Sequence, residues 1–114
     1  MKILNLTKNT VIASDVKIAD TLATRGVGLL NRRIITEDQA LIIKPCQSIH
    51  MFFMRFPIDV IFVNAENNVE GIVADIKPFQ LSPIFFKASY AIELKSGRIR
   101  TTKTRVGDRI SLAS

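Results

Sequence analysis

Residues Ile49–Val63, with the sequence IHMFFMRFPIDVIFV, decide the fold that we expect for this chain. Every second residue from Phe52 to Phe62 is apolar, and most of the residues between them are apolar too. This period of two is typical of a pleated strand with one face fully buried and the other largely buried. Because Pro57 has no amide hydrogen to donate to a sheet, the stretch predicts two short strands joined by a bend.

The bend is expected between Arg55 and Asp59, the two charges that this apolar stretch has to accommodate. They are four residues apart, about 13 Å along a straight strand, so they meet only if the chain turns between them. Buried charges are rarely left unpaired, and an internal Arg–Asp hydrogen-bond network is therefore our first interpretation. A functional role for the pair is the alternative. His50, the only histidine, opens the stretch, and a single histidine beside apolar residues is more often a core or rim residue than a ligand.

Length and cysteine content limit the architecture. The chain has 114 residues, of which 47% are hydrophobic, and this fits a single domain over residues 1–114 with a real core. Cys46 is the only cysteine, which excludes an internal disulfide framework and a four-cysteine zinc site and suits a reducing compartment. With a single histidine as well, a Cys/His metal centre is nearly excluded and only carboxylates are left as metal ligands, so we expect no metal site and no cofactor.

The sequence shows no feature of export or membrane insertion. Its first ten residues, MKILNLTKNT, lack the apolar core and the small-residue cleavage site of a signal peptide. No uncharged segment approaches the ~20 residues that a membrane span needs. We therefore expect a soluble, cytoplasmic protein, monomeric and with no membrane as partner.

The net charge of +6 is unevenly distributed. Basic residues crowd the C-terminal stretch, and a second group lies near the N-terminal third: Arg98, Arg100, Lys103, Arg105 and Arg109, then Arg25, Arg32 and Arg33. Such charge attracts phosphates and anionic surfaces. The aromatic residues expected in a single-strand binder are sparse, with one Tyr and no Trp, so a basic solvated face is the first interpretation and nucleic-acid binding the alternative.

Periodicity and turn residues place the remaining elements. A helix is expected from Thr21, capped by Asp20, and one helical turn or a basic loop over Arg98–Arg105. Further strands are expected over Lys2–Leu6, Val11–Asp20, Ala40–Ile43, Val69–Ile76, Ser89–Lys95 and Val106–Leu112, with Val69–Ile76 folding back as a hairpin on Asp59–Val63. The pattern predicts an α+β, mainly β protein: a small, strongly bent sheet or partly closed β-barrel of about seven short strands with one or two short helices.

Evidence for catalysis is thin. The loop Lys44–Ser48 brings Cys46 close to His50 in the sequence, but a nucleophile–base pair also needs a third group to orient it, and none is apparent. Asp59 and Glu93 are the carboxylates expected to face inward. General acid–base catalysis by two carboxylates requires a defined distance between them, which the sequence does not give. Whether the protein is an enzyme stays open, and we lean toward no.

The central motif, KPCQSIHMFFMRFPIDVIFV, joins with RGVGLLNR before it and with ASYAIELKSGRI and VGDRIS after it. In this combination the chain resembles the domain of unknown function 192 family, also called uncharacterised protein family 0127, from about residue 11 to residue 112. The resemblance implies a small, single-domain, β-rich fold without an agreed activity.

Two functions of different classes follow. The first is a non-catalytic binding module that holds a small polar or anionic ligand in a β-barrel pocket. Its candidate ligand-binding residues are His50, Arg55, Asp59, Arg25 and Cys46. The alternative is binding of nucleic acid, RNA in particular, through Arg98, Arg100, Lys103 and Arg105. A small enzyme of unknown reaction ranks third.

Overall fold

Strands dominate the part of the chain that the computed structural model describes, residues 1–20, 34–52 and 54–113. The elements in chain order are β1 (Lys2–Asn5), β2 (Thr10–Ala13), β3 (Asp15–Ala19), β4 (Gln39–Ile43), β5 (Ile58–Asn64), β6 (Val69–Ile76), β7 (Ala88–Lys95), α2 (Arg98–Thr101) and β8 (Ile110–Ala113). The helix predicted from Thr21 lies outside the described residues. No helix within the described ranges is long and apolar enough to cross a lipid bilayer.

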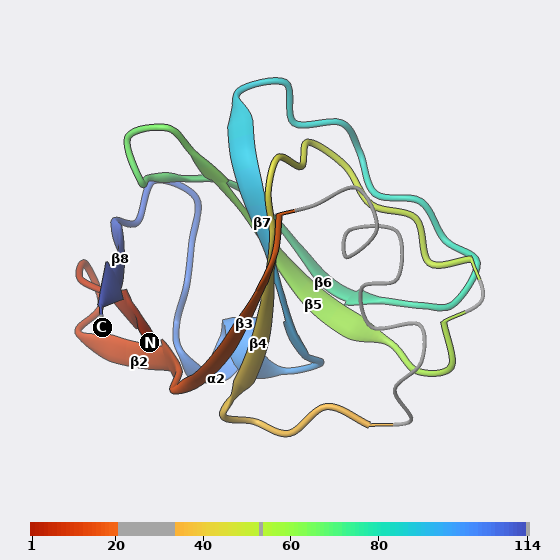
Figure 1. Cartoon of the computed structure of the whole chain (residues 1–114), viewed down its shortest axis with the longest axis horizontal. Coiled ribbons are helices and arrows are strands. Elements are labelled where there is room, and N and C mark those ends of the chain that lie inside the picture. The colour runs from red at the N-terminus through yellow and green to blue at the C-terminus, as the bar shows by residue number, and fades with distance from the viewer. Residues whose placement is uncertain (21–33, 53, 114) are drawn as a thin grey trace.

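The strands form two sheets (Figure 1). A small sheet has the order β2-β1-β8, and a larger one has the order β3-β4-β7-β5-β6. The β3–β4 pair is parallel, whereas the other pairs are antiparallel. The prediction of a mainly β, α+β fold is confirmed, and its described strands make two open sheets rather than a closed barrel.

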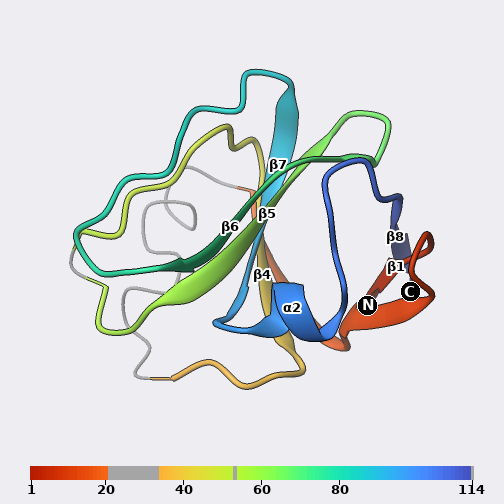
Figure 2. The ribbon, with the colours of Figure 1, turned by 180° about the vertical axis from the view of Figure 1, so that it is seen from behind.

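The larger sheet is apolar on both faces, as the central stretch predicted. One face packs against the small sheet in a first core, where Tyr90 and Ile92 of β7 meet Ile3 and Ile12. The other face carries a second core around Val60 and Phe62 of β5, covered by buried side chains of the loops, Met51 and Met54 among them. Figure 2 shows these loops running along the side of the larger sheet away from the small one.

The β5–β6 hairpin is confirmed, and its turn depends on Asn64 and Asn67. Asn67 takes the left-handed conformation at φ 64°, which asparagine tolerates better than most residues. The Asn64 Oδ1 accepts hydrogen bonds from the amides of Glu66 and Asn68, both at 3.0 Å. The side chain thereby closes the turn that the sequence NAENN indicates.

The prediction of one strand over Val11–Asp20 is wrong. The chain breaks at Ser14, so that β2 pairs with β1 in the small sheet while β3 pairs with β4 in the larger one. The amides of Ser14 and Asp15 both donate to the Asp38 carbonyl oxygen, at 2.9 Å each. This contact holds the chain where it passes from one sheet to the other.

The central stretch forms one strand instead of the expected two. Only its second half enters a sheet, as β5. The first half runs as a loop, in which His50 makes an isolated antiparallel bridge with Leu81. The proline therefore ends regular pairing on its N-terminal side instead of bending a continuous strand.

Candidate functional site

A cavity of ≈ 640 Å³ opens where the central stretch enters the larger sheet. Its wall combines the connection before β4, the turn into β5 and the end of β7: Ile34, Ile35, Thr36, Glu37, Asp38, Phe56, Pro57, Lys95 and Ser96. The chain passes Phe56 and Pro57 before entering β5, and both side chains form part of this wall. Pro57 therefore forms part of a cavity wall, instead of bending the chain to bring two charges together.

The wall carries charges of both signs. Glu37 and Asp38 supply two carboxylates, and Lys95 supplies one ammonium group. The Thr36 hydroxyl donates a 2.6 Å hydrogen bond to Asp38, and this contact holds the pKa of that carboxyl below its usual value. Ser96 donates from its hydroxyl to Asp75, at 2.7 Å. The cavity therefore offers an apolar wall with a few fixed polar groups.

Glu93 lies on the same side of β7 as Lys95, two residues further into the sheet. It stands opposite Leu41 of β4 and Val60 of β5, which belong to the second core. Its side chain is 6% exposed, and removal from water raises its pKa to about 7. The expectation that Glu93 faces inward is confirmed, and its carboxyl lies beside apolar residues of the second core.

Asp59 is also buried, as expected, but its partners are backbone amides. Its Oδ1 accepts from the Asp75 amide at 2.8 Å, and its Oδ2 accepts from the amides of Gly97 and Ile99 at 3.0 and 2.9 Å. Asp59 stands opposite Leu94, on the α2 side of the sheet. Its carboxylate therefore connects β5 to β6 and to the start of α2.

The expected internal pair between Arg55 and Asp59 is not found among the described residues. The Arg55 side chain is exposed, and it precedes the Phe56–Pro57 part of the cavity wall. Three amides satisfy the Asp59 charge, so the carboxylate needs no guanidinium. Arg55 remains a candidate ligand-binding residue, next in sequence to the cavity wall. Asp59 instead has a structural role, because its carboxylate binds backbone amides.

Cys46 and His50 have separate contacts. The half-buried Cys46 thiol donates to the Ser48 carbonyl oxygen at 3.2 Å. The exposed His50 ring stacks on Phe52, with 5.2 Å between the ring centroids. Neither contact is the thiol–imidazole hydrogen bond that would activate a nucleophile. Arg25, the remaining candidate, lies outside the described residues.

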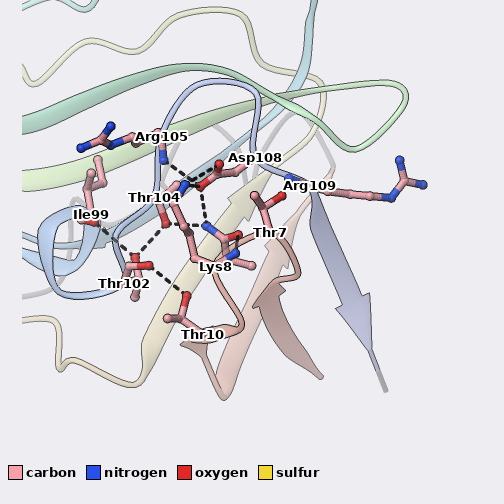
Figure 3. A network of polar contacts seen from close by, with 10 residues as sticks. Thr7, Lys8, Thr10, Ile99, Thr102, Thr104, Arg105, Asp108 and Arg109 are labelled. Carbon is pink, nitrogen blue, oxygen red and sulfur yellow. Dashed lines mark hydrogen bonds and ion pairs between the residues drawn. The ribbon is translucent and has the colours of Figure 1, made fainter.

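A network of polar contacts fixes the basic C-terminal stretch (Figure 3). The buried Asn5 amide donates to Thr104 and Asp108, at 3.1 and 2.9 Å, and the Lys8 ammonium group binds Asp108 at 2.8 Å. Burial by itself would raise the pKa of Asp108, but the hydrogen bonds from Asn5, Lys8 and the Arg105 amide, together with the Lys8 charge, outweigh it and lower that pKa. Asp108, the one acid of residues 98–114, is thereby neutralised inside the fold.

The basic side chains of this stretch divide into two kinds. Arg98 is half-buried, and its guanidinium donates to the carbonyl oxygens of Val11 and Ile12 at 2.9 and 3.0 Å. Arg98 therefore joins α2 to β2. The others are exposed, and Figure 3 shows the Arg105 and Arg109 side chains leading away from the network: Arg100, Lys103, Arg105 and Arg109.

Sequence reasoning missed the cavity wall at residues 34–38, because it interpreted Thr36–Gln39 only as a polar connection before the strand Ala40–Ile43. Nothing local marks these residues, because their place beside Lys95 arises from the pairing of β4 with β7. Within the described ranges, no three His, Cys, Asp or Glu side chains gather in a way that could hold a metal ion.

The sequence profile of a known family, DUF192, described as Uncharacterized ACR, matches residues 3–112. The chain belongs to the DUF192 family. The resemblance noted from the central motif is thereby confirmed. A DUF192 relative, the UPF0127 protein of Pyrococcus furiosus, is 33% identical over 110 residues that cover 94% of each chain. The UPF0127 protein of Thermococcus kodakarensis is 34% identical over 113 residues, which cover 96% of this chain and 71% of that one.

Two solved structures share the fold of this DUF192 protein. A protein of unknown function from Novosphingobium aromaticivorans has a TM-score of 0.85 at 21% identity, covering 97% of this chain and 84% of that one. A putative transcription regulator from Sinorhizobium meliloti has a TM-score of 0.79 at 19% identity, covering 96% of this chain and 89% of that one. At these identities the likeness shows the fold alone.

Proposed function

We propose that this DUF192 protein is a non-catalytic binding module that holds a small polar ligand in the cavity beside Pro57. The observation that carries the proposal is the cavity itself. Its volume of ≈ 640 Å³ falls within the range of small-molecule sites, about 300–1,000 Å³. Its apolar wall with a few charged groups also follows the usual design of such sites.

The charges of the wall indicate the class of ligand. Two carboxylates, Glu37 and Asp38, oppose a purely anionic ligand by like-charge repulsion. Lys95 in the wall, and Arg55 next to Phe56 in the sequence, supply positive charge that offsets these carboxylates. A polar ligand with a cationic group, or with charges of both signs, therefore suits the cavity better than a simple anion.

The contacts of Cys46 and His50, the nucleophile–base candidates from the sequence, favour a binding role over a catalytic one. Cys46 donates to its own loop, and His50 stacks on Phe52. Asp59 is saturated by backbone amides and is directed away from the cavity wall. Binding needs only the shaped wall, whereas catalysis would need a reacting group aimed into it.

Calorimetric titration with a panel of small polar compounds tests the proposal. The panel contains amino acids, polyamines, nucleotides, phosphosugars and carboxylates. We expect binding of a cationic or zwitterionic member, and loss of that binding in Ile34→Trp, which places an indole at the cavity wall. Glu37→Gln should weaken binding by about tenfold, the effect of one charge-assisted hydrogen bond.

The matched controls lie elsewhere on the surface. Leu6→Trp places the same indole at a residue that is 52% exposed outside the cavity wall, and Glu66→Gln removes a charge in the β5–β6 turn. Both should leave the affinity unchanged. If no compound binds, or if Ile34→Trp binds as the unaltered protein does, the cavity is not a ligand site.

Nucleic-acid binding is the second candidate, and one specific observation favours it. Arg100, Lys103 and Arg105 are exposed within six residues, while Asp108, the nearest acid along the sequence, is buried and neutralised by Lys8. Cations arranged without competing acids suit a phosphate backbone. Arg98 is no longer part of this candidate surface, because its guanidinium donates hydrogen bonds to carbonyl oxygens of β2.

Fluorescence anisotropy with labelled RNA and DNA over a range of salt concentrations distinguishes this candidate. Binding through three phosphates predicts an affinity that falls steeply with salt, with a slope that drops by about one for each of Arg100→Ala, Lys103→Ala and Arg105→Ala. Lys2→Ala, on β1, is the control. An affinity that does not respond to salt excludes this candidate and leaves the cavity proposal untouched.

A further inference from the structure

Two loops outside the sheets are joined to each other along their length. Backbone hydrogen bonds run between residues 47–52 and 79–86: Phe85 to Gln47, Ser82 to Ile49, Met51 to Gln80 and Phe79 to Met51, each donor named first, at 2.8–2.9 Å. His50 and Leu81 add an isolated bridge. We call these residues the loop ladder. Figures 1 and 2 both place the two loops side by side, at the end of the molecule away from the small sheet.

The inner side of the loop ladder is anchored in the second core. Met51 is 1% exposed. The Phe85 ring packs on Phe62 with 4.6 Å between centroids, and it lies so close to Gly71 that a β-carbon there would clash with it. The ladder is therefore fixed to the sheet and presents its outer side chains from a defined support.

The loop ladder exposes several large apolar side chains beside polar ones such as Gln47, His50 and Gln80. The exposed fractions of the apolar side chains are 77% for Phe86, 66% for Phe79, 65% for Leu81, 56% for Ile84 and 40% for Phe52. Scattered apolar residues on a surface need no explanation, but several along one structural feature mark an interaction site. Phe79 also has a φ of 68°, a conformation that a bulky residue rarely adopts and that clusters at functional sites.

The two stretches of chain that carry these apolar side chains are basic. Residues 44–57 and 77–87 contain Lys44, Arg55, Lys77 and Lys87, and all four are exposed. The same two stretches contain neither Asp nor Glu. The surface is thus apolar and cationic at once, and a second copy of the chain is a poor partner because its equal charges would repel.

We propose that the loop ladder docks this protein onto an anionic lipid bilayer. The apolar side chains enter the interface, and the exposed Arg55, Lys77 and Lys87 of the same two stretches meet lipid phosphates. The exposed apolar side chains are Phe, Leu and Ile, which have no hydrogen-bonding groups. The residues that contribute most of the binding energy at protein interfaces are more often Tyr, Trp and Arg, which do have such groups. A fluid bilayer requires no such directional contacts. Surface docking also needs no spanning segment, whose absence was the basis for expecting no membrane partner.

Co-sedimentation with phosphatidylcholine vesicles, with and without phosphatidylglycerol, tests the proposal at low salt. We expect binding to the anionic vesicles and at least about tenfold weaker binding to the neutral ones. Lys77→Glu with Lys87→Glu should abolish the preference. Ile84→Ser with Phe86→Ser should weaken binding by about tenfold or more through the loss of buried apolar area. Circular dichroism and thermal melts verify that each variant is folded.

Matched variants outside the ladder serve as controls. Lys2→Glu with Lys17→Glu changes the net charge equally, and Leu6→Ser with Val11→Ser removes apolar residues that are 52% and 49% exposed. Arg100→Glu with Lys103→Glu tests the other basic region. Controls that bind clearly better than the ladder variants support the proposal. It is overturned if the controls lose as much binding as the ladder variants, or if anionic vesicles do not bind at all, in which case an acidic protein becomes the occupant to seek.

Discussion

At the scale of single residues, Glu93 is the described carboxyl whose pKa is raised furthest above its ordinary value. It occupies the middle of β7 between two apolar neighbours, Leu41 and Val60. Its folded-state pKa of about 7 lies well above the value of 4.5 that is usual for a glutamate. The carboxyl therefore folds in its neutral form and resists ionisation until the solution is close to neutral pH.

This shift predicts a stability that falls with rising pH. Below about pH 4.5 the carboxyl is protonated in both states. Between that pH and about 7 the unfolded chain ionises while the folded one holds its proton, so ionisation progressively favours unfolding. The stability lost is on the order of 3 kcal/mol, from 1.36 kcal/mol per unit of pKa. Glu93→Gln should remove this loss, which urea unfolding at a series of pH values measures.

The control for this prediction is Glu66→Gln, which removes the same charge from an exposed turn. Its stability should follow that of the unaltered protein at every pH. Parallel pH profiles for Glu93→Gln and the unaltered protein would show that Glu93 does not titrate differently on folding.

Burial of Asp59 and Glu93 could be predicted from the sequence, because both sit within the alternating pattern of buried strands. Their partners could not. The amides that bind Asp59 belong to residues 16, 38 and 40 positions away, and only the folded chain brings them together. Arg55 was assigned to Asp59 because it was the nearest opposite charge, and backbone donors carry no signal in the sequence.

At the scale of elements, Asp59 is the point where β5, β6 and α2 are joined. Gly97, the N-cap of α2, has φ 99° and no side chain with which to cap the helix. The Asp59 carboxylate accepts from the Gly97 and Ile99 amides in place of a local cap. The third amide, that of Asp75, is at a residue of β6 with φ 53°, where the pairing with β5 shifts register, so one carboxylate stabilises left-handed backbone at two places.

Removing this carboxylate should therefore loosen three elements together. We expect Asp59→Ala to lower the free energy of unfolding by about 3 kcal/mol, since it leaves one buried and two partly buried amides without acceptors. Amide hydrogen exchange should accelerate most at Asp75, Gly97 and Ile99. The exposed Asp15→Ala provides the control. If those three amides keep their exchange rates while overall stability falls, the carboxylate does not hold β6 and the start of α2 in place.

Element boundaries followed from the sequence where turn residues coincide with a change of pattern. The β5–β6 hairpin and the alternation of β7 are such cases. Val11–Asp20 is the opposite case, because the apolar pattern continues through Ser14 while the chain moves to another sheet. That break depends on the Asp38 carbonyl oxygen, which comes close only when β3 pairs with β4. The local sequence predicts the alternation of a strand, but it does not predict which other strand it pairs with.

At the scale of the molecule, the two sheets share one core. Ile3, Ile12 and Ile110 of the small sheet pack in the same cluster as Ile92 and Tyr90 of the larger one. The apolar residues of the small sheet therefore share their interior with the larger sheet and are buried in the same cluster as residues of β7. A chain of this size with a shared core is expected to unfold in a single cooperative step.

Tyr90 makes this prediction measurable, because it is the only tyrosine and the chain has no tryptophan. Tyrosine fluorescence should report the shared core, while far-ultraviolet circular dichroism reports all strands. We expect the two signals to coincide through urea unfolding, and Ile12→Ala to lower both midpoints together, by about 2–5 kcal/mol in stability, without changing the slope. Leu6→Ala, at a residue 52% exposed, should leave both midpoints nearly unchanged. Separate transitions, or a shift in only one signal, would mean that the small sheet unfolds by itself and that contact with β7 does not hold it.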